Sequence, residues 1–400
     1  MMFTLIRNEM IKLMSRKKTV IITIAFAILV AFIGFAMYKT SESMKEWNKP
    51  ERRIQNEQEN IKHLEEFKKD PKIPEEEKKR FDEDIKQSYE KIEEIKKEKQ
   101  GVKPDWRVTL KKEISGMEAQ LKDTQIREQD KESIKLELMT KKYLLENNIQ
   151  PEYNSYDVTA TAFIRQLFEI LGAIFLAVGV IIFSSDMVSG EYTPPTMKFL
   201  LTQPVSRGKV LFSKFIALIL SSSIIIVAIE ILAFLIMGLI FSFGNMDYPV
   251  TTGTRFMYDL TVKGEMGQKA ITAIAGSSHI IPMWKYIVQM FGIQILFIIA
   301  SASFAFLLST VVKSSMVSMA STTVIIIAFT IAQTIPYINK YAHYLFTTFG
   351  DPSKIITGNI ALRSNNPVIT PTFSIAILLG WTIVSYVISH VVFKKRDILI

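Results

Sequence analysis

Two carboxylates in apolar surroundings are the residues of this 400-residue chain best placed for chemistry inside a membrane, Glu169 and Glu230. An ionised group in hydrocarbon is costly unless it is paired or hydrated. Glu169 follows Arg165 by four residues, so the two can form an ion pair on one helix face. Glu230 has no charged neighbour at that spacing. We therefore expect Glu230 to serve a conduit or an interface, with a neutral acid hydrogen-bonded to another helix as the alternative.

Motifs of common enzymes and metal sites do not occur in the sequence. The chain has no cysteine. Its only Gly-Lys dipeptide, Gly208-Lys209, lacks the upstream glycine and the following Ser or Thr of a phosphate-binding loop. The histidines are scattered and form no H-E-x-x-H pair: His63, His279, His343 and His390. We expect no catalytic residue, no metal site and no cofactor bound directly by this chain.

Charge is divided unevenly along the sequence. Residues 41–157 hold 26 Lys and Arg and 29 Asp and Glu, whereas the remainder holds 22 Lys and Arg and only 10 Asp and Glu. The basic excess outside 41–157 clusters at the ends of apolar segments, as in membrane proteins. This placement argues against nucleic acid as a partner and favours membrane lipid.

Six segments are apolar and long enough to cross a bilayer, for which a helix needs about 20 residues. They are 19–38, 162–184, 210–243, 285–312, 315–337 and 373–393. The predicted fold class is thus an all-α membrane protein with six transmembrane helices. Residues 1–18 form an amphipathic helix before the first span, and 394–400 form a tail after the last.

Basic residues indicate the orientation, because short cytoplasmic loops are enriched in Lys and Arg. With both termini cytoplasmic, the inside segments hold Arg7, Lys12, Arg16, Lys17, Lys18, Lys198, Arg207, Lys209, Lys214, Lys313, Lys394, Lys395 and Arg396. The outside loops 244–284 and 338–372 are sparser in such residues for their length. We therefore predict a multi-pass protein of the plasma membrane whose 41–157 insertion is extracytoplasmic.

The insertion reads as short helices with narrow apolar seams. Pro71, Pro74 and Pro104 divide it into pieces. Apolar residues recur at alternating spacings of three and four amid Glu and Lys, which is typical of coiled coils. The seam residues are Ile54, Ile61, Leu64, Phe81, Ile85, Ile92, Ile95, Leu110, Ile114, Met117 and Leu121. A spacer and a partner-binding domain are both compatible with this pattern.

The most specific stretch is the loop 186–209 between the second and third spans. Its middle, TMKFLLTQP, is a short amphipathic segment that Pro194 and Pro195 begin and Pro204 ends. Met197, Leu200 and Leu201 can share one face, with Lys198 near the other. From the residues alone, an interfacial helix that anchors the loop in the lipid headgroups fits this pattern.

Three strings in this loop resemble the permease subunits of ATP-binding-cassette exporters of the type-2 permease family. They are Gly190-Glu191-Tyr192-Thr193, Thr196 to Leu201, and Pro204-Val205-Ser206-Arg207. The six-span plan and the N-terminal stretch FTLIRNEMIKLMSRKK resemble the family as well. The resemblance implies that 186–209 carries a coupling helix docked on a separate ATPase subunit, and that 338–372 forms short re-entrant helices of an outer gate.

Transport is the leading function under this resemblance. The chain would be the permease of an exporter, paired with a second permease chain as a homodimer or heterodimer. ATP and magnesium would bind to the partner ATPase. The alternative is a membrane-anchored sensor or scaffold with 41–157 as its receptor, but six spans with short inside loops favour transport.

The orientation can be tested with single cysteines in this cysteine-free chain. Cysteine at Gln100 is expected to react with a membrane-impermeant thiol reagent in intact cells, and cysteine at Gln203 only after permeabilisation, because the two positions lie on opposite sides of the membrane. Labelling at 203 in intact cells would reverse the orientation.

Overall fold

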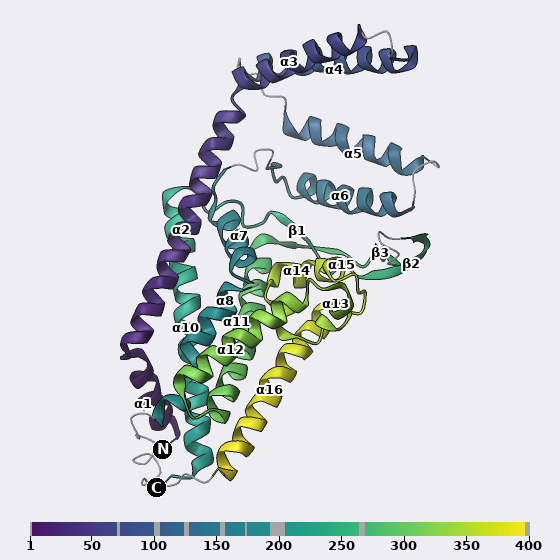
Figure 1. Ribbon diagram of the computed structural model, residues 1–400. Coiled ribbons are helices and arrows are strands. Elements are labelled where there is room, and N and C mark those ends of the chain that lie inside the picture. The colour runs from purple at the N-terminus through teal and green to yellow at the C-terminus, as the bar shows by residue number, and fades with distance from the viewer. Residues whose placement is uncertain are drawn as a thin grey trace. The chain divides into compact units, whose positions relative to one another are not determined.

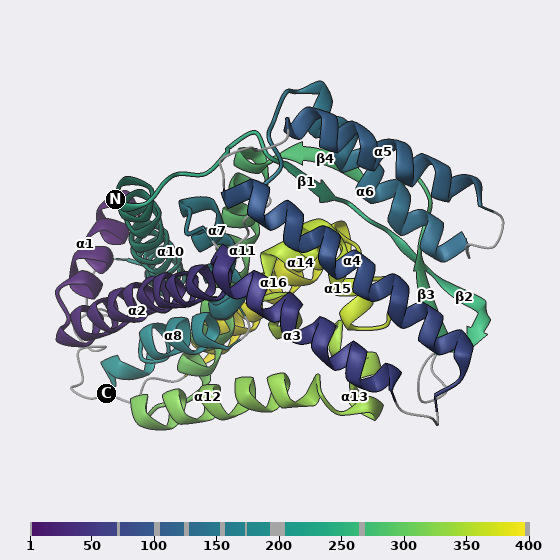
Figure 2. The same cartoon turned by 90° about the horizontal axis from the view of Figure 1, so that it is seen from above.

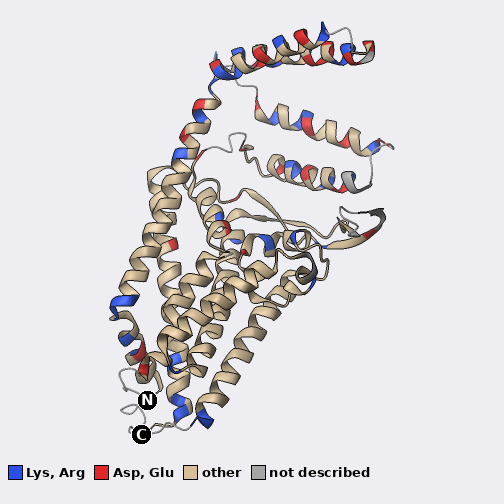
Figure 3. Cartoon of the chain, in the orientation of Figure 1, with Lys and Arg blue, Asp and Glu red and all other residues tan. Residues whose placement is uncertain are grey.

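A computed structural model describes residues 2–69, 73–99, 105–123, 128–152, 157–172, 174–192, 205–263 and 269–396. These residues are mostly helical, as predicted, and the chain divides into two compact units. The first unit comprises Met1–Gly34, Ile126–Thr140 and Thr159–Ile400, and the second comprises Phe35–Gln125 and Lys141–Val158. Figure 3 shows that charged residues are frequent on the helices of the insertion and near the ends of the apolar helices.

The first unit is a bundle of apolar helices, seen from the side in Figure 1 and from above in Figure 2. Its main elements are α1 (Met2–Met14), the part of α2 (Lys17–Trp47) that ends at Gly34, α7 (Ala160–Gly172), α8 (Phe175–Ser184), α10 (Arg207–Ile240), α11 (Met283–Val311), α12 (Ser315–Ala332) and α16 (Pro371–Lys395). Helix α11 lies at the core of this unit. In its most apolar stretch 61% of the residues are buried, against 17–22% in the other long apolar helices. It contacts α7, α8, α10, α12 and α16.

Among the described residues, five helices are long and apolar enough to cross a membrane, or six if a bent pair counts as one span. The bent pair is α7 and α8, which replace the straight helix predicted over 162–184 and meet at 64°. The start of α1 and the end of α16 lie at the same end of the bundle, as an even number of crossings requires (Figure 1).

Two other predicted spans differ at their ends. Helix α2 continues beyond residue 38 to Trp47, because the charged residues that follow the apolar run are good helix formers. The span predicted over 315–337 ends at Ala332, and α13 (Pro336–Ala342) begins after it. Proline at 336 has no N–H to continue the helix and holds Ile335 in an extended conformation, with ψ of 118°.

Two short antiparallel sheets lie in the loop between α10 and α11, where only a loop was expected. Strand β1 (Pro249–Thr252) pairs with β4 (His279–Pro282), and β2 (Phe256–Lys263) pairs with β3 (Lys269–Ala273). Between β1 and β2, the Gly253 N–H donates to the Ile356 carbonyl at 2.9 Å. The loop is thereby fixed to the short helix α14 (Pro352–Thr357).

The loop predicted over 338–372 contains further short helices: η3 (Phe346–Phe349), α14 and α15 (Asn359–Arg363). This segment contacts the bend of the second span through two glycines. A Cβ at Gly172 would lie 2.1 Å from the Gly350 carbonyl oxygen, and a Cβ at Gly350 would lie 1.6 Å from the Gly172 oxygen. Only glycine permits such an approach of two backbones.

The second unit contains the helices predicted for the insertion: α3 (Pro50–Lys68), α4 (Glu75–Lys99) and α5 (Trp106–Lys122), with the end of α6 (Glu128–Glu146). Helix α3 contacts α4. Seam residues Ile61, Ile92 and Ile95 are buried, as are Leu110 and Ile114. Burial of these five residues agrees with the apolar seams predicted from their spacing, while a coiled-coil geometry stays a prediction.

Candidate functional site

The loop that the sequence singled out is described at its two ends. Gly190, Glu191, Tyr192 and Arg207 lie within the described residues. Thr196, Met197, Lys198, Leu200, Leu201 and Pro204 lie outside them, so the short helix expected there stays a prediction. The described ends nevertheless form a polar site, which we call the loop anchor: Glu9, Lys12, Asp186, Glu191, Lys214 and Ser309.

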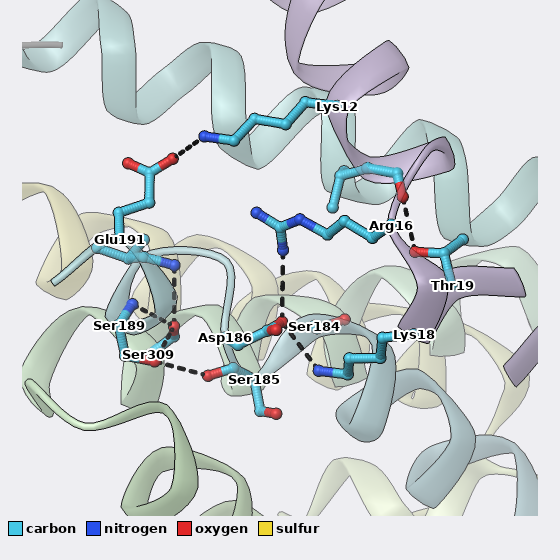
Figure 4. A network of polar contacts seen from close by, with 12 residues as sticks. Lys12, Arg16, Lys18, Thr19, Ser184, Ser185, Asp186, Ser189, Glu191 and Ser309 are labelled. Atoms are coloured by element: carbon cyan, nitrogen blue, oxygen red, sulfur yellow. Dashed lines mark hydrogen bonds and ion pairs between the residues drawn. The ribbon is translucent and has the colours of Figure 1, made fainter. Parts of the chain in front are cut away.

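A buried ion cluster is the centre of the loop anchor. The Lys214 ammonium on α10 is completely buried and lies 2.6 Å from Glu191 Oε1. It also lies 2.9 Å from Glu9 Oε1 on α1. Lys12, one turn beyond Glu9, reaches the same Glu191 oxygen at 2.5 Å (Figure 4). Two acids and two bases thus neutralise one another, which buried charges require because desolvation is otherwise uncompensated.

A second ion cluster lies where α1 meets α2. Asp186 follows the last turn of α8, and its Oδ1 lies 2.9 Å from Lys18 Nζ and 3.7 Å from Arg16 Nη1 (Figure 4). The chain then makes a tight turn, in which the Gly190 N–H donates to the Asp186 carbonyl at 2.9 Å. A Cβ at Gly190 would lie 3.3 Å from the Asp186 Cβ. This turn directs Glu191 inward to Lys214.

Hydroxyl groups fix the backbone of the turn to the neighbouring spans. Ser309 Oγ on α11 accepts hydrogen bonds from the N–H groups of Val188 and Ser189, both at 3.0 Å (Figure 4). Ser318 Oγ on α12 donates to the Ser185 carbonyl at 2.6 Å. The start of the loop is therefore bonded to α11 and α12 as well as to α1 and α10.

The far end of the loop meets the end of α16. The Arg396 guanidinium lies over the Tyr192 ring, 5.2 Å from its centroid, and donates to the Thr310 carbonyl at 2.7 Å. Arg207, at the start of α10, donates to the Arg396 carbonyl at 3.1 Å. The structure thus brings Tyr192 and Arg207 to one region through Arg396, which the sequence analysis used only for the orientation.

Glu230 lies on α10 at the interface with α11. Its carboxylate is fully buried and accepts a hydrogen bond from Gln294 Nε2 at 2.7 Å. Glu230 Oε2 and Gln294 Oε1 have no hydrogen-bond partner among the described residues. The hydrogen bond to another helix is thus present, as one of the two alternatives for Glu230 anticipated.

Glu169 does not pair with Arg165 as expected. Its Oε1 lies 3.5 Å from Lys354 Nζ, and its side chain is 63% exposed. The reason is the contact between α14 and α7, which brings Lys354 to Glu169. Glu169 therefore lies at an accessible surface of α7 and not in closed apolar surroundings.

The loop anchor predicts that Lys214 is essential to stability. Lys214→Met leaves Glu9 and Glu191 buried with one fewer cation and should cost about 3–5 kcal/mol, the usual cost of breaking a buried pair. The measurement is the thermal unfolding midpoint in detergent. Lys209→Met, at an exposed position of the same helix, serves as the control and should change little. Equal midpoints for the two variants would contradict the anchor.

The polar pair between α10 and α11 yields a second stability prediction. Gln294→Leu removes the donor to a buried carboxylate and should cost about 1–3 kcal/mol. Glu230→Gln should cost less, because an amide oxygen at 230 still accepts from Gln294. Unfolding midpoints distinguish the two, with Gln166→Leu at an exposed position as control. Loss of transport by a stable Glu230→Gln protein would then assign a conduit role to the carboxylate.

Comparisons with known proteins agree with a bundle of apolar helices. A chain of Bacillus subtilis (strain 168), "Uncharacterized membrane protein YdbK", is 30% identical over 220 residues, which cover 54% of this chain and 76% of that one. "Uncharacterized protein YhcI" of the same organism is 26% identical over 296 residues, 72% of this chain and 84% of that one. The model of the ABC-2 family transporter proteins matches residues 3–398. The chain therefore belongs to the ABC-2 family of transporter proteins, as a membrane component of the transport system.

Proposed function

We propose that this chain is the permease of an ATP-binding-cassette exporter in the plasma membrane. It moves a substrate across the membrane while a separate subunit, which binds ATP and magnesium, hydrolyses the nucleotide. Membership of the ABC-2 family supports the proposal, as do the five or six helices in the described part of the chain that are long and apolar enough to span a membrane. The sequence itself contains no phosphate-binding loop with which to bind ATP.

The loop anchor is the observation that carries the coupling part of the proposal. The loop 186–209 begins at a turn bonded to α1 and α10 through Lys214, and to α11 and α12 through Ser309 and Ser318. A displacement of the loop by a bound ATPase is therefore transmitted to four helices through short, buried contacts. A coupling element needs such a connection, because packed helices respond to a local displacement as rigid bodies.

Two kinds of protein partner follow from the proposal. The ATPase subunit docks on the loop 186–209, where Leu200 and Leu201 supply apolar area. A second permease chain, identical or different, completes the transport path. The insertion 41–157 lies outside the cell, where its charged helices are in contact with water and with the substrate or a partner.

Polar substitution of the loop tests the docking. Leu200→Asp with Leu201→Asp removes two apolar side chains, each worth about 1.5–3 kcal/mol when buried. The double variant should reach the membrane at normal abundance, because no span is altered. It should lose the ATPase subunit that copurifies with the wild-type chain, and with it the ATP hydrolysis that substrate stimulates.

The matched control is Leu200→Met with Leu201→Met, which keeps the apolar surface and should retain the ATPase. An interfacial helix without a coupling role predicts the opposite result for the aspartate variant, namely an ATPase that stays bound and active. That outcome would refute the coupling assignment.

A further inference from the structure

An apolar groove runs along the bundle between α2, α8 and α10. It is partly open at the surface and is lined by Ile22 and Phe26 of α2, Gly179 and Phe183 of α8, and Ser222 and Ile226 of α10, among others. Along α8 the lining extends from Phe175 to Phe183, about 12 Å at the helical rise per residue.

No side chain fills the space beside Gly179, and the lining of the groove has few groups that could form hydrogen bonds with a ligand. A Cβ added at Gly179 would meet nothing within 4 Å, so the glycine leaves open space in the wall. The lining is apolar apart from Thr23 and Ser222. The Ser222 hydroxyl already donates to the Leu218 carbonyl at 2.9 Å. Water therefore gains nothing there, whereas hydrocarbon fits.

One end of the groove borders a basic layer. Ile22 follows Arg16, Lys17 and Lys18 by about one helical turn, and Phe183 lies three residues before Asp186. The layer holds three cations against one carboxylate, since Asp186 is the acid that pairs with Arg16 and Lys18. Lys17 is exposed. The net positive charge at the mouth complements an anionic headgroup.

We propose that this groove binds one acyl chain of an anionic phospholipid, from the leaflet next to the chain termini. The acyl chain of the lipid lies between α2, α8 and α10, and its phosphate lies against the basic layer at Arg16, Lys17 and Lys18. Apolar walls with a basic mouth match a glycerophospholipid in both of its parts. The site shares the ion pairs of Asp186 with the loop anchor, but it does not depend on the proposed function.

The experiment fills the groove without disturbing its walls. Full-length protein is purified from membranes containing equal phosphatidylglycerol and phosphatidylcholine, and retained lipid is counted by native mass spectrometry. Wild type should retain about one phosphatidylglycerol per chain after extensive washing. Gly179→Leu should retain at least tenfold less. The matched control is Gly380→Leu on α16, where a Cβ also meets nothing within 4 Å, and it should retain lipid as wild type does.

The headgroup is tested separately. Lys17→Gln should keep a bound lipid but lower its preference for phosphatidylglycerol over phosphatidylcholine about fivefold, the effect of one basic residue at an anionic surface. Three outcomes would overturn the proposal: no lipid retained by wild type, equal retention by Gly179→Leu and Gly380→Leu, or a shift of Gly179→Leu from dimer to monomer with its lipid count unchanged. The last result would place a helix of a second chain in the groove.

Discussion

The need to neutralise charge inside an apolar bundle governs the organisation of this protein. Lys214 lies within a long apolar helix and has no exposed surface, so it must find carboxylates. It finds Glu9 from the first helix and Glu191 from the loop after the second span. Three segments distant in sequence are thereby held at one point. The turn at 185–191 and the position of α1 both follow from this neutralisation.

The same cluster explains why a short amphipathic helix at the N-terminus belongs to the bundle and is not merely a membrane anchor. Helix α1 contacts α10 and supplies both Glu9 and Lys12. Because Lys12 and Lys214 share one oxygen of Glu191, the acid is held from two directions. The serines of α11 and α12 then fix the backbone beside it. The ion pairs of Lys214 join α10 to α1 and to the loop, and the hydroxyl groups of Ser309 and Ser318 fix the backbone of the turn.

The sequence predicted what depends on local composition and missed what depends on contacts between distant segments. The apolar runs identified α2, α10, α11 and α16, because hydrophobic length is a local property. The seams of the insertion were found for the same reason. The break between α7 and α8 was missed, since it accompanies a contact of Gly172 with Gly350, which lies far along the chain. The partners of Lys214 and Glu169 were missed likewise, although a lone lysine in an apolar helix was a signal for a buried pair. The strands between α10 and α11 were hidden by the absence of a long alternating pattern.

The glycine contact also limits how the bundle can move. Where two backbones touch without side chains between them, no rearrangement of side chains can let one backbone slide over the other. No side chain separates helix α7 from the segment around Gly350, so these two parts are in direct backbone contact beside the 64° bend before α8.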